Sequence, residues 1–370
     1  MTPRIVFVLG TRPEIVKLAP IIRACDRAEV EYAVVHTGQH YSERLDGVFF
    51  DDLELPEPEY NLEVGSGDHA AQTGEMVSRL GGVIEREAPD IVIVQGDTNS
   101  AFAGGIVASK RDAVLGHVEA GLRSFNRELP EELNRVLIDH AADHLFAPTD
   151  EAADQLRREA IPDERIEVTG NTVVDAVQQH ERLARTKSDV LTELGVADEP
   201  FALMTAHRGA NVDDPDRFQG LLDGIGAYGA HTDVPVVYPV HPRSAENIDE
   251  YDLDVPEEIR CVDPLNFLDF LRLESEASIV FTDSGGVQEE TCVLETPCVT
   301  VRESTERPET LAVGSNVLAD PTPESIVAAA FEVRDGPNDW ESPFGDGHAA
   351  DRILETFGVD APPLSEEVPL

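Results

Sequence analysis

Basic residues are scarce in this chain, and lysine is almost absent from it. The 370 residues include 28 Lys and Arg against 73 Asp and Glu, which gives a formal net charge of -45. Lysine occurs only at Lys17, Lys110 and Lys187. Because no basic stripe exists to meet a phosphate backbone, the sequence argues against nucleic acid as a partner.

The acidic residues are spread along every segment instead of gathering in a tail or a repeat. A uniformly acidic, lysine-poor surface is typical of proteins that work at high salt, where screening removes the self-repulsion of the chain. We therefore expect a halophilic protein. The alternative is an acidic patch that binds cations or basic partners.

Cysteine pairs and long apolar runs are also missing. Cys25, Cys261, Cys292 and Cys298 show no Cys-x-x-Cys spacing, so we expect buried free thiols and neither disulfides nor a zinc site. No apolar run approaches the ~20 residues of a membrane span, so no membrane association is expected. The chain enters a predicted strand at residue 5 without a basic-then-apolar leader, which favours a cytoplasmic protein.

Strand-like and helix-like stretches alternate along the chain, and its length suggests two domains. The expected strands are residues 5–9, 32–37, 91–94, 114–118 and 144–147, then 201–205, 236–239, 259–262, 279–282 and 298–301. This rhythm predicts an α/β fold with two Rossmann-like, doubly wound parallel-sheet domains facing a cleft. We expect an N-terminal domain over 1–170 and a C-terminal, UDP-binding domain over 171–346. A helix within about 347–370 is expected to pack back on the first domain.

The clearest candidate ligand site follows the predicted strand 279–282. A tight turn contains Ser284, Gly285 and Gly286, and a helical pattern begins near residue 287. Glycines let backbone N–H groups approach a ligand, and a helix N-terminus favours anions, so the turn is suited to a diphosphate. Glu290, one helical turn further on, could accept hydrogen bonds from two ribose hydroxyls. The alternative is that glycine is needed at this turn for steric reasons alone.

Polar residues follow the strands of the first half as well, where ligands of such sheets bind. Arg12 and Lys17 lie near a predicted helix N-terminus, which disfavours cations unless an anionic ligand is present. Asp97 follows the strand 91–94, although it could simply cap the next helix. Glu119 lies directly beyond a buried strand, where a purely solvated role is harder to assign. Glu131 stands in the first turn of a helix and, taken alone, is an ordinary dipole partner.

The second half repeats this arrangement with two histidines and an arginine. His207 and His241 each follow a predicted strand, where a histidine can donate to phosphate or titrate near neutral pH. Either could instead be a packed loop residue. Arg307 supplies another cation just beyond the strand 298–301.

Taken together, these motifs are far more specific than any one of them. In chain order they are GTRPEIVK (10–17), GDT (96–98), HVEAGLR (117–123), PEELNR (130–135), GNTVVD (170–175), TAHR (205–208), DSGGVQEE (283–290) and TERPE (305–309). Over nearly the whole chain this resembles the non-hydrolysing UDP-N-acetylglucosamine 2-epimerases. The resemblance implies a fold like that of GT-B glycosyltransferases, a homodimer and a place in polysaccharide biosynthesis. It also implies interconversion of UDP-N-acetylglucosamine and UDP-N-acetylmannosamine with no metal and no cofactor.

The reaction implied by the resemblance explains why these residue types are needed. The C2 proton of the sugar is not next to a carbonyl, but it becomes removable when UDP leaves C1, giving 2-acetamidoglucal. Re-addition of UDP with a proton delivered to the other face of C2 gives the epimer. By similarity, the catalytic candidates are Asp97, Glu119, Glu131 and His207. The substrate-binding candidates are Arg12, Lys17, His207, Ser284, Gly285, Gly286, Glu290 and Arg307.

Several bacterial members of that family are activated by a second UDP-N-acetylglucosamine molecule. Residues that resemble positions near this regulatory site are Gln39, His40, Gln72 and His241. The sequence departs from the family pattern nearby, with Ala206 where many relatives carry glycine and with Asn211 and Val212 in place of Glu-Asn.

Other functions stay open at this point. The nucleotide motifs also fit a GT-B glycosyltransferase and an epimerase of a related UDP-acetamido sugar. A hydrolysing epimerase would release free N-acetylmannosamine and UDP. A non-enzymatic sugar-nucleotide sensor is the remaining alternative.

Overall fold

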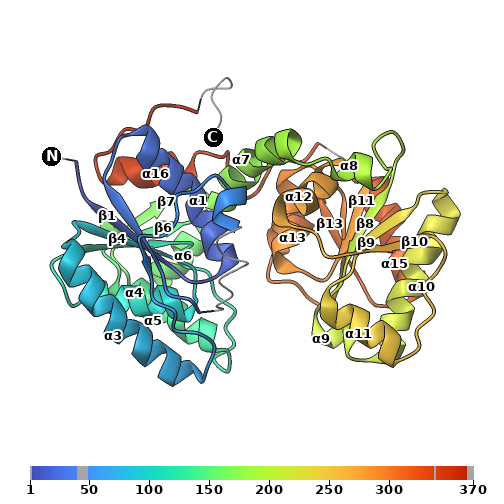
Figure 1. Ribbon diagram of the computed structural model, residues 1–370, viewed down its shortest axis with the longest axis horizontal. Helices are drawn as coiled ribbons and strands as arrows, with labels where there is room; N and C mark the ends of the chain where they lie inside the picture. Colours follow the sequence, from blue (N-terminus) through green and yellow to red (C-terminus); the bar gives the residue numbers. More distant parts are fainter. Residues whose placement is uncertain (1, 40–48, 337–338, 365–370) are drawn as a thin grey trace. The chain divides into compact units, whose positions relative to one another are not determined.

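The computed structural model describes residues 2–39, 49–336 and 339–364. His40, predicted for a regulatory site, lies outside these residues. The chain divides into two compact units (Figure 1), one formed by Met1–Gln179 with Phe344–Leu370 and the other by His180–Pro343. The boundary at Gln179 falls inside one helix, α7.

The first unit is built on a seven-stranded sheet in the order β3-β2-β1-β4-β5-β6-β7. All of its neighbouring strands are parallel. Its strands are β1 (Ile5–Leu9), β2 (Tyr32–His36), β3 (Tyr60–Asn61), β4 (Ile91–Gln95), β5 (Val114–Val118), β6 (His144–Ala147) and β7 (Ile166–Val168). The strand order reverses between β1 and β4, and in such sheets ligands bind at the carboxyl ends of the strands beside this reversal.

Helices cover both faces of this sheet. They are α1 (Arg12–Arg27), α3 (His69–Glu87), α4 (Asn99–Ala108), α5 (Pro130–Ala141), α6 (Asp150–Arg158), the 3-10 turn η1 (Asp163–Arg165), α7 (Thr172–Lys187) and α16 (Ala349–Thr356). In Figure 1, α3, α4 and α5 lie on one side of the sheet, and α1 and α16 lie on the other. Because both faces are covered, strands such as β1 are buried throughout and read as continuous apolar runs.

Helix α4 lies unusually close to the sheet, because it consists mostly of small residues. A Cβ at Gly104 would meet Val94 Cγ1 at 2.8 Å and Val8 Cβ at 3.1 Å. This close packing brings the start of α4, and the loop before it, to the carboxyl end of β4.

The second unit has a six-stranded parallel sheet in the order β10-β9-β8-β11-β12-β13. Its strands are β8 (Ala202–Thr205), β9 (Val236–Pro239), β10 (Ile259–Val262), β11 (Ile279–Thr282), β12 (Cys298–Val301) and β13 (Asn316–Ala319). Here the order reverses between β8 and β11. The register pairs Thr282 with Thr205, so the loops that follow these two strands start side by side.

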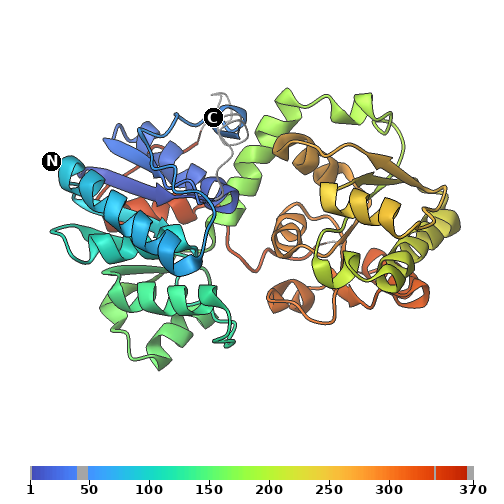
Figure 2. The same ribbon diagram turned by 60° about the horizontal axis from the view of Figure 1, so that its bottom comes forward.

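The helices of the second unit complete its doubly wound arrangement (Figure 2). They are α8 (Val190–Glu193), α9 (Gly209–Val212), α10 (Pro215–Thr232), α11 (Pro242–Glu250), α12 (Phe267–Glu276), α13 (Gly285–Val293), α14 (Pro308–Ala312) and α15 (Pro323–Arg334). The predicted fold class of two Rossmann-like parallel-sheet units is confirmed. The prediction missed the strands β3, β7 and β13.

The C-terminal helix α16 belongs to the first unit. The Asp175 carboxylate accepts hydrogen bonds from Ala349 N (3.2 Å) and Ala350 N (2.9 Å), which satisfies otherwise unpaired donors at the helix start. Arg27 of α1 forms an ion pair with Asp351 at 2.7 Å. These contacts hold α16 against α1.

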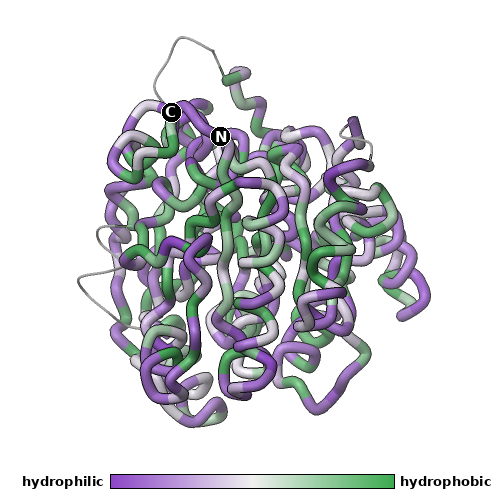
Figure 3. Tube along the Cα trace, turned by 90° about the vertical axis from the view of Figure 1, so that its right-hand side faces the viewer, coloured by the Kyte–Doolittle hydropathy of each residue, from purple (hydrophilic) through white to green (hydrophobic). Residues whose placement is uncertain are grey.

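Polar residues are distributed along the chain and do not gather in one segment. Polar stretches recur along the described trace (Figure 3).

The four cysteines are free, and Cys25, Cys292 and Cys298 are buried as expected. The expectation of burial is wrong for Cys261, which is exposed because β10 is an edge strand with its middle residues facing solvent. Over the part of the chain that the structure describes, no helix combines the length and apolarity needed to cross a bilayer.

Candidate active site

A buried carboxyl group ties together the loops that follow β1 and β4. Glu14, in the first turn of α1, is only 1% exposed. It accepts hydrogen bonds from Gly10 N (3.0 Å), Thr11 Oγ1 (2.8 Å) and Thr98 Oγ1 (2.6 Å). Burial raises its pKa to about 7, against the lowering effect of these donors. The segment that carries Arg12 is thereby joined to the segment that carries Asp97.

Glu119 is the most extensively held of the predicted carboxylates. It follows β5, and its side chain is almost fully buried. Its carboxylate accepts from Lys17 Nζ at 2.7 Å, from Asn171 Nδ2 at 3.3 Å and from the side-chain amide of Gln95. The backbone φ of Glu119 is +66°, a left-handed conformation that is costly for a non-glycine residue and is common where function requires it. Lys17 and Glu119, predicted separately, thus form one buried ion pair.

Asp97 lies close to both other predicted carboxylates. It forms an ion pair with Arg135 of α5. Burial raises the pKa of Asp97 above its usual range; Arg135 opposes this, and the nearby negative charges of Glu119 and Glu131 add to it. The alternative that Asp97 caps α4 is wrong, because Thr98 is the cap and accepts from Ala101 N at 3.0 Å.

Glu131 lies in the exposed first turn of α5, which begins at Pro130. The same helix carries Asn134, whose amide donates to Asp97 O at 2.9 Å. Helix α5 therefore places Glu131, Asn134 and Arg135 around Asp97. Sequence reasoning assigned no role to Arg135, although its position four residues after Glu131 puts it on the same helix face.

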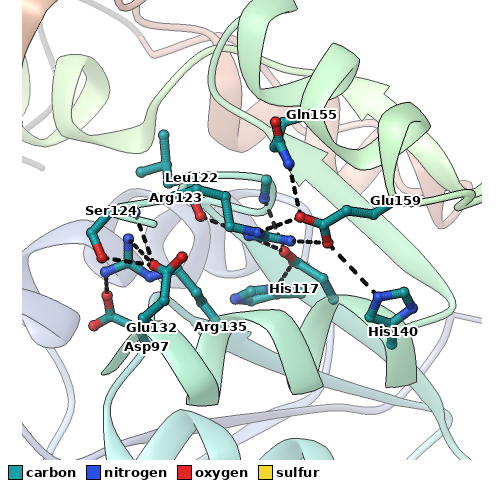
Figure 4. A network of polar contacts seen from close by, with 12 residues as sticks. Asp97, His117, Leu122, Arg123, Ser124, Glu132, Arg135, His140, Gln155 and Glu159 are labelled. Carbon is teal, nitrogen blue, oxygen red and sulfur yellow. Dashed lines mark hydrogen bonds and ion pairs between the residues drawn. The ribbon is translucent and has the colours of Figure 1, made fainter. Parts of the chain in front are cut away.

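A network of charged groups underlies this cluster (Figure 4). His117 lies between Gly96 O (Nε2, 2.8 Å) and Asp139 Oδ1 (Nδ1, 2.7 Å). Arg123 pairs with Asp139 and with Glu159, each at 2.7 Å. The network fixes the loop after β5, which holds Glu119. It was not predicted, since residues so far apart in sequence give no local signal.

Gln39 and Gln72, predicted for a regulatory site, lie together but bind the protein itself. Gln72 Nε2 donates to Gln39 O (3.1 Å) and Gly65 O (2.7 Å). Gln39 Oε1 accepts from Ser100 N (3.1 Å) and Ser100 Oγ (2.8 Å). Both side chains thus join the loop after β2 to α3 and α4.

The predicted binding residue Arg12 is exposed to solvent, and its guanidinium lies over the Phe49 ring, 5.8 Å from the ring centroid.

In the second unit, the start of α13 is open. Ser284 is the N-cap residue, and its side chain makes no capping bond. A Cβ at Gly285 would meet nothing closer than Arg208 Nη2 at 3.8 Å, and one at Gly286 nothing closer than Ser284 Oγ at 3.9 Å. Protein packing therefore does not demand glycine here. The space over the helix N-terminus suits an anion.

One arginine lies beside this helix start, since Arg208 Nη2 is 3.8 Å from a Cβ built on Gly285. A cavity of about 400 Å³ is lined by Arg208, Arg217 and Arg302 among other residues. Burial, followed by the positive charge of Arg302, lowers the pKa of Arg208 from its usual value. Arg217 and Arg302 form ion pairs with Glu303 and Glu306, so Arg208 is the arginine of this lining that is placed to meet an anion at the start of α13. Sequence reasoning missed Arg208 as a candidate residue, although it stands beside the predicted His207.

Buried Asp283 positions His207 and Arg208. It accepts from His207 N (3.1 Å) and Arg208 N (3.0 Å), and His207 Nδ1 lies 3.2 Å from its carboxylate. Burial alone would raise the pKa of Asp283, but the contacts with His207 outweigh it and lower that pKa. The rings of His207 and His241 lie near one another, with centroids 6.1 Å apart.

The remaining predicted residues of this unit lie on or beside α13. Arg307 forms an ion pair with buried Glu289. Glu290 is partly exposed, one turn into the helix. Among the residues placed by the structure, no three His, Cys, Asp or Glu side chains are grouped as metal ligands would be.

Comparison with known proteins gives a consistent result. Residues 23–358 match the family described as UDP-N-acetylglucosamine 2-epimerase. The chain is 44% identical to the UDP-N-acetylglucosamine 2-epimerase of Methanocaldococcus jannaschii, over 95% of this chain and 98% of that protein. It is 35% identical to a UDP-2,3-diacetamido-2,3-dideoxy-D-glucuronate 2-epimerase of Pseudomonas aeruginosa, over 95% of this chain and 98% of the relative.

A solved structure shares the fold at similar identity. It is the M. jannaschii UDP-GlcNAc 2-epimerase in complex with UDP-GlcNAc and UDP, with a TM-score of 0.83 and 43% identity. The match covers 96% of this chain and 99% of that one.

Removing the cation beside Asp97 tests the electrostatics of the cluster. We expect Arg135→Met to raise the pKa of Asp97 further, because the opposing positive charge is lost while burial and the neighbouring carboxylates remain. The carboxyl carbon of Asp97, followed by NMR titration, reports this shift. Arg111→Met, which removes an exposed ion pair with Glu85, is the control and should leave Asp97 unchanged. An unshifted Asp97 in Arg135→Met would contradict the arrangement.

Proposed function

The chain belongs to the UDP-N-acetylglucosamine 2-epimerase family, and we propose that it interconverts UDP-N-acetylglucosamine and UDP-N-acetylmannosamine by elimination and re-addition of UDP. The observation that carries this proposal is the gathering of Asp97, Glu119 and Lys17 at the carboxyl edge of the first sheet. Carboxylates next to a buried cation supply the proton transfers that inversion at C2 requires.

In the proposed reaction a carboxylate takes the C2 proton while the bond from C1 to the β-phosphate oxygen breaks. The electron pair of the C2–H bond forms the C1=C2 double bond of 2-acetamidoglucal, and the pair of the C1–O bond leaves with UDP. In the return step a protonated carboxyl on the other face of C2 delivers its proton as UDP attacks C1. Every atom is recovered, so no co-reactant is needed.

The three carboxylates differ in their surroundings. The ion pair with Lys17 favours the ionised form of Glu119, which suits a base. The raised pKa of Asp97 favours its protonated form relative to an ordinary aspartate, which suits a group that returns a proton. Glu131 is the third candidate, since its charge is close enough to act on Asp97.

We propose that the second unit is the UDP-binding domain. Ser284, Gly285 and Gly286 would hold the diphosphate at the α13 start, and Glu290 would bind the ribose hydroxyls. Support comes from the open helix N-terminus and from Arg208 beside it. The other candidates for binding the UDP-sugar are Arg12, Lys17, His207 and Arg307. His207 would also stabilise departing UDP from its position on Asp283.

Other functions are less well supported. A glycosyltransferase is not favoured, because the family match and the relatives at 35–44% identity are 2-epimerases. The more similar of these two relatives acts, by its name, on UDP-N-acetylglucosamine, and we prefer this sugar to a diacetamido one because of that higher identity.

Regulation by a second UDP-N-acetylglucosamine near Gln39, Gln72 and His241 is a further proposal from the resemblance. We also propose a cytoplasmic location and a role in polysaccharide biosynthesis.

The proposal of a homodimer is supported by one apolar surface. Large exposed hydrophobic side chains of the described residues include Phe125 at 74% and Leu129, Leu133 and Leu137 at 41–48%. The three leucines are four residues apart in the sequence, so they lie in a row from the N-cap of α5 along its exposed side. Phe125 has a φ of +57°, held by bonds from Ser124 N and Phe125 N to buried Glu132. We call this surface the α5 stripe.

A second copy of the chain is the occupant that fits the α5 stripe. The side chains of the α5 stripe expose on the order of 400 Å² of apolar surface. This is close to the apolar part of the ~800 Å² that each partner buries in an interface of standard size. A cavity of about 470 Å³ beside Leu133 and Phe125 could receive an aromatic ring of the partner. Burial of these apolar side chains would offset part of the repulsion between two chains of net charge -45. The same helix carries Glu131 and Arg135, so pairing would brace the proposed active site.

Exchange at C2 tests the reaction. Incubated with UDP-N-acetylglucosamine in D2O and molar KCl, the protein should give a mixture of epimers with deuterium at C2, seen by NMR. Asp97→Asn, Glu119→Gln and Glu131→Gln should each lower turnover by on the order of 10²- to 10⁴-fold while UDP still binds. Glu128→Gln, an exposed neighbour of Glu131, is the matched control. An unchanged spectrum with wild-type protein would refute the reaction, and near-normal turnover in all three variants would refute the acid and base assignment.

Salt dependence tests the proposed halophilic character. With 73 acidic residues against 28 basic ones, removal of salt unscreens repulsion across the folded surface. We expect the melting temperature to fall steadily as KCl is lowered from molar concentrations. A melting temperature indifferent to KCl would count against this proposal.

Light scattering in molar KCl tests the dimer. Wild-type protein should have twice the 40.3 kDa mass of one chain, and Phe125→Ser with Leu133→Ser should shift it to one chain. The control combines Val114→Ser with Val168→Ser, which changes exposed hydrophobic residues elsewhere on the same unit and should stay dimeric. A monomeric wild type, or a dimer that survives the stripe substitutions, would be evidence against this surface.

A further inference from the structure

Helix α12 carries a buried carboxyl group to which the proposed reaction gives no role. Glu274 is 1% exposed. Within the described part of the chain, neither of its side-chain oxygens receives a hydrogen bond from a donor group. Its backbone carbonyl is satisfied separately, by Thr296 Oγ1 at 3.0 Å. Burying an ionised carboxylate without a donor or a cation is strongly unfavourable.

The polar group that faces this carboxyl is another carboxyl. The side chain of Glu290, on α13, lies within hydrogen-bonding reach of Glu274, and its negative charge acts on it. Cys298 of β12 is a buried thiol near enough to Glu274 for the two groups to interact electrostatically. Two carboxyl groups in contact cannot both be ionised at low cost, so one of them keeps a proton.

The burial of the two residues decides which one keeps it. Glu290 is partly exposed, so water and ligands can reach it, whereas Glu274 is enclosed. Desolvation and the charge of Glu290 together raise the pKa of Glu274 well above its usual range. The proton therefore belongs to Glu274, and the charge to Glu290.

We propose that Glu274 is a positioning residue, which donates its carboxyl proton to Glu290 and so fixes the carboxylate that binds the ribose of the nucleotide. This inference rests on the proposed role of Glu290. A hydrogen bond from a neutral acid to a carboxylate is strong and short. A neutral donor of this kind adds no positive charge beside Glu290.

Two substitutions of similar size separate donation from packing. Glu274→Gln keeps a donor in the form of an amide, and Glu274→Met keeps the volume without any donor. The readout is the ratio of the dissociation constants of UDP and 2′-deoxy-UDP, measured by titration calorimetry. A merely structural role would weaken both ligands alike and leave this ratio unchanged.

Wild-type protein should prefer UDP to 2′-deoxy-UDP by about tenfold or more, as expected for a lost hydrogen bond to a charged group. Glu274→Met should reduce this preference to less than about threefold, and Glu274→Gln should keep most of it. A preference retained in full by Glu274→Met would overturn the role of Glu274 alone. No preference in the wild type would instead remove the ribose role of Glu290, and this inference with it.

Infrared spectroscopy gives a second test that needs no ligand. The difference between wild type and Glu274→Gln at neutral pH should contain the C=O stretch of one protonated carboxylic acid. The comparison isolates Glu274 from other buried acids such as Glu14, because those are present in both proteins. A difference spectrum that shows only an ionised carboxylate would overturn the proposal, even if the binding ratios had moved.

Discussion

The carboxylate of Glu119 is the point on which the first unit depends. It receives hydrogen bonds from Lys17 in α1, from Gln95 at the end of β4 and from Asn171 just before α7. One side chain thus fixes the relative positions of the connections that follow several neighbouring strands. Its left-handed backbone conformation is maintained because these contacts compensate the strain. The result is a charged group held rigidly at a place where water has limited access.

The proposed sites of the two units handle charge differently, although both units bury carboxylates. The first unit buries carboxylates and offsets them with single cations, as Lys17 does for Glu119 and Arg135 does for Asp97. The second unit leaves a helix N-terminus open, with Arg208 beside it. One arrangement suits proton transfer, and the other suits holding an anion. The proposed reaction needs both kinds of group, one to move a proton and one to hold an anion.

Much of this could be predicted from the sequence, because strands buried on both faces are continuous apolar runs and the turns after them are distinctive. The short strands β3, β7 and β13 were missed, since a few residues at or near a sheet edge give no periodic signal. The pairing of Lys17 with Glu119 could not be predicted, because the two are 102 residues apart. Nor could the buried contact between Glu274 and Glu290, which depends on how two helices pack.

The central claim is that UDP leaves the sugar while carboxylates around Glu119 act on C2. UDP-N-acetylglucosamine labelled with 18O at the oxygen between C1 and the β-phosphate tests it most directly. If the bond breaks and re-forms, the label in recovered substrate will appear at non-bridging positions of the β-phosphate, and Glu119→Gln will slow its appearance. Label that stays at the bridging position while the epimer accumulates would contradict the account.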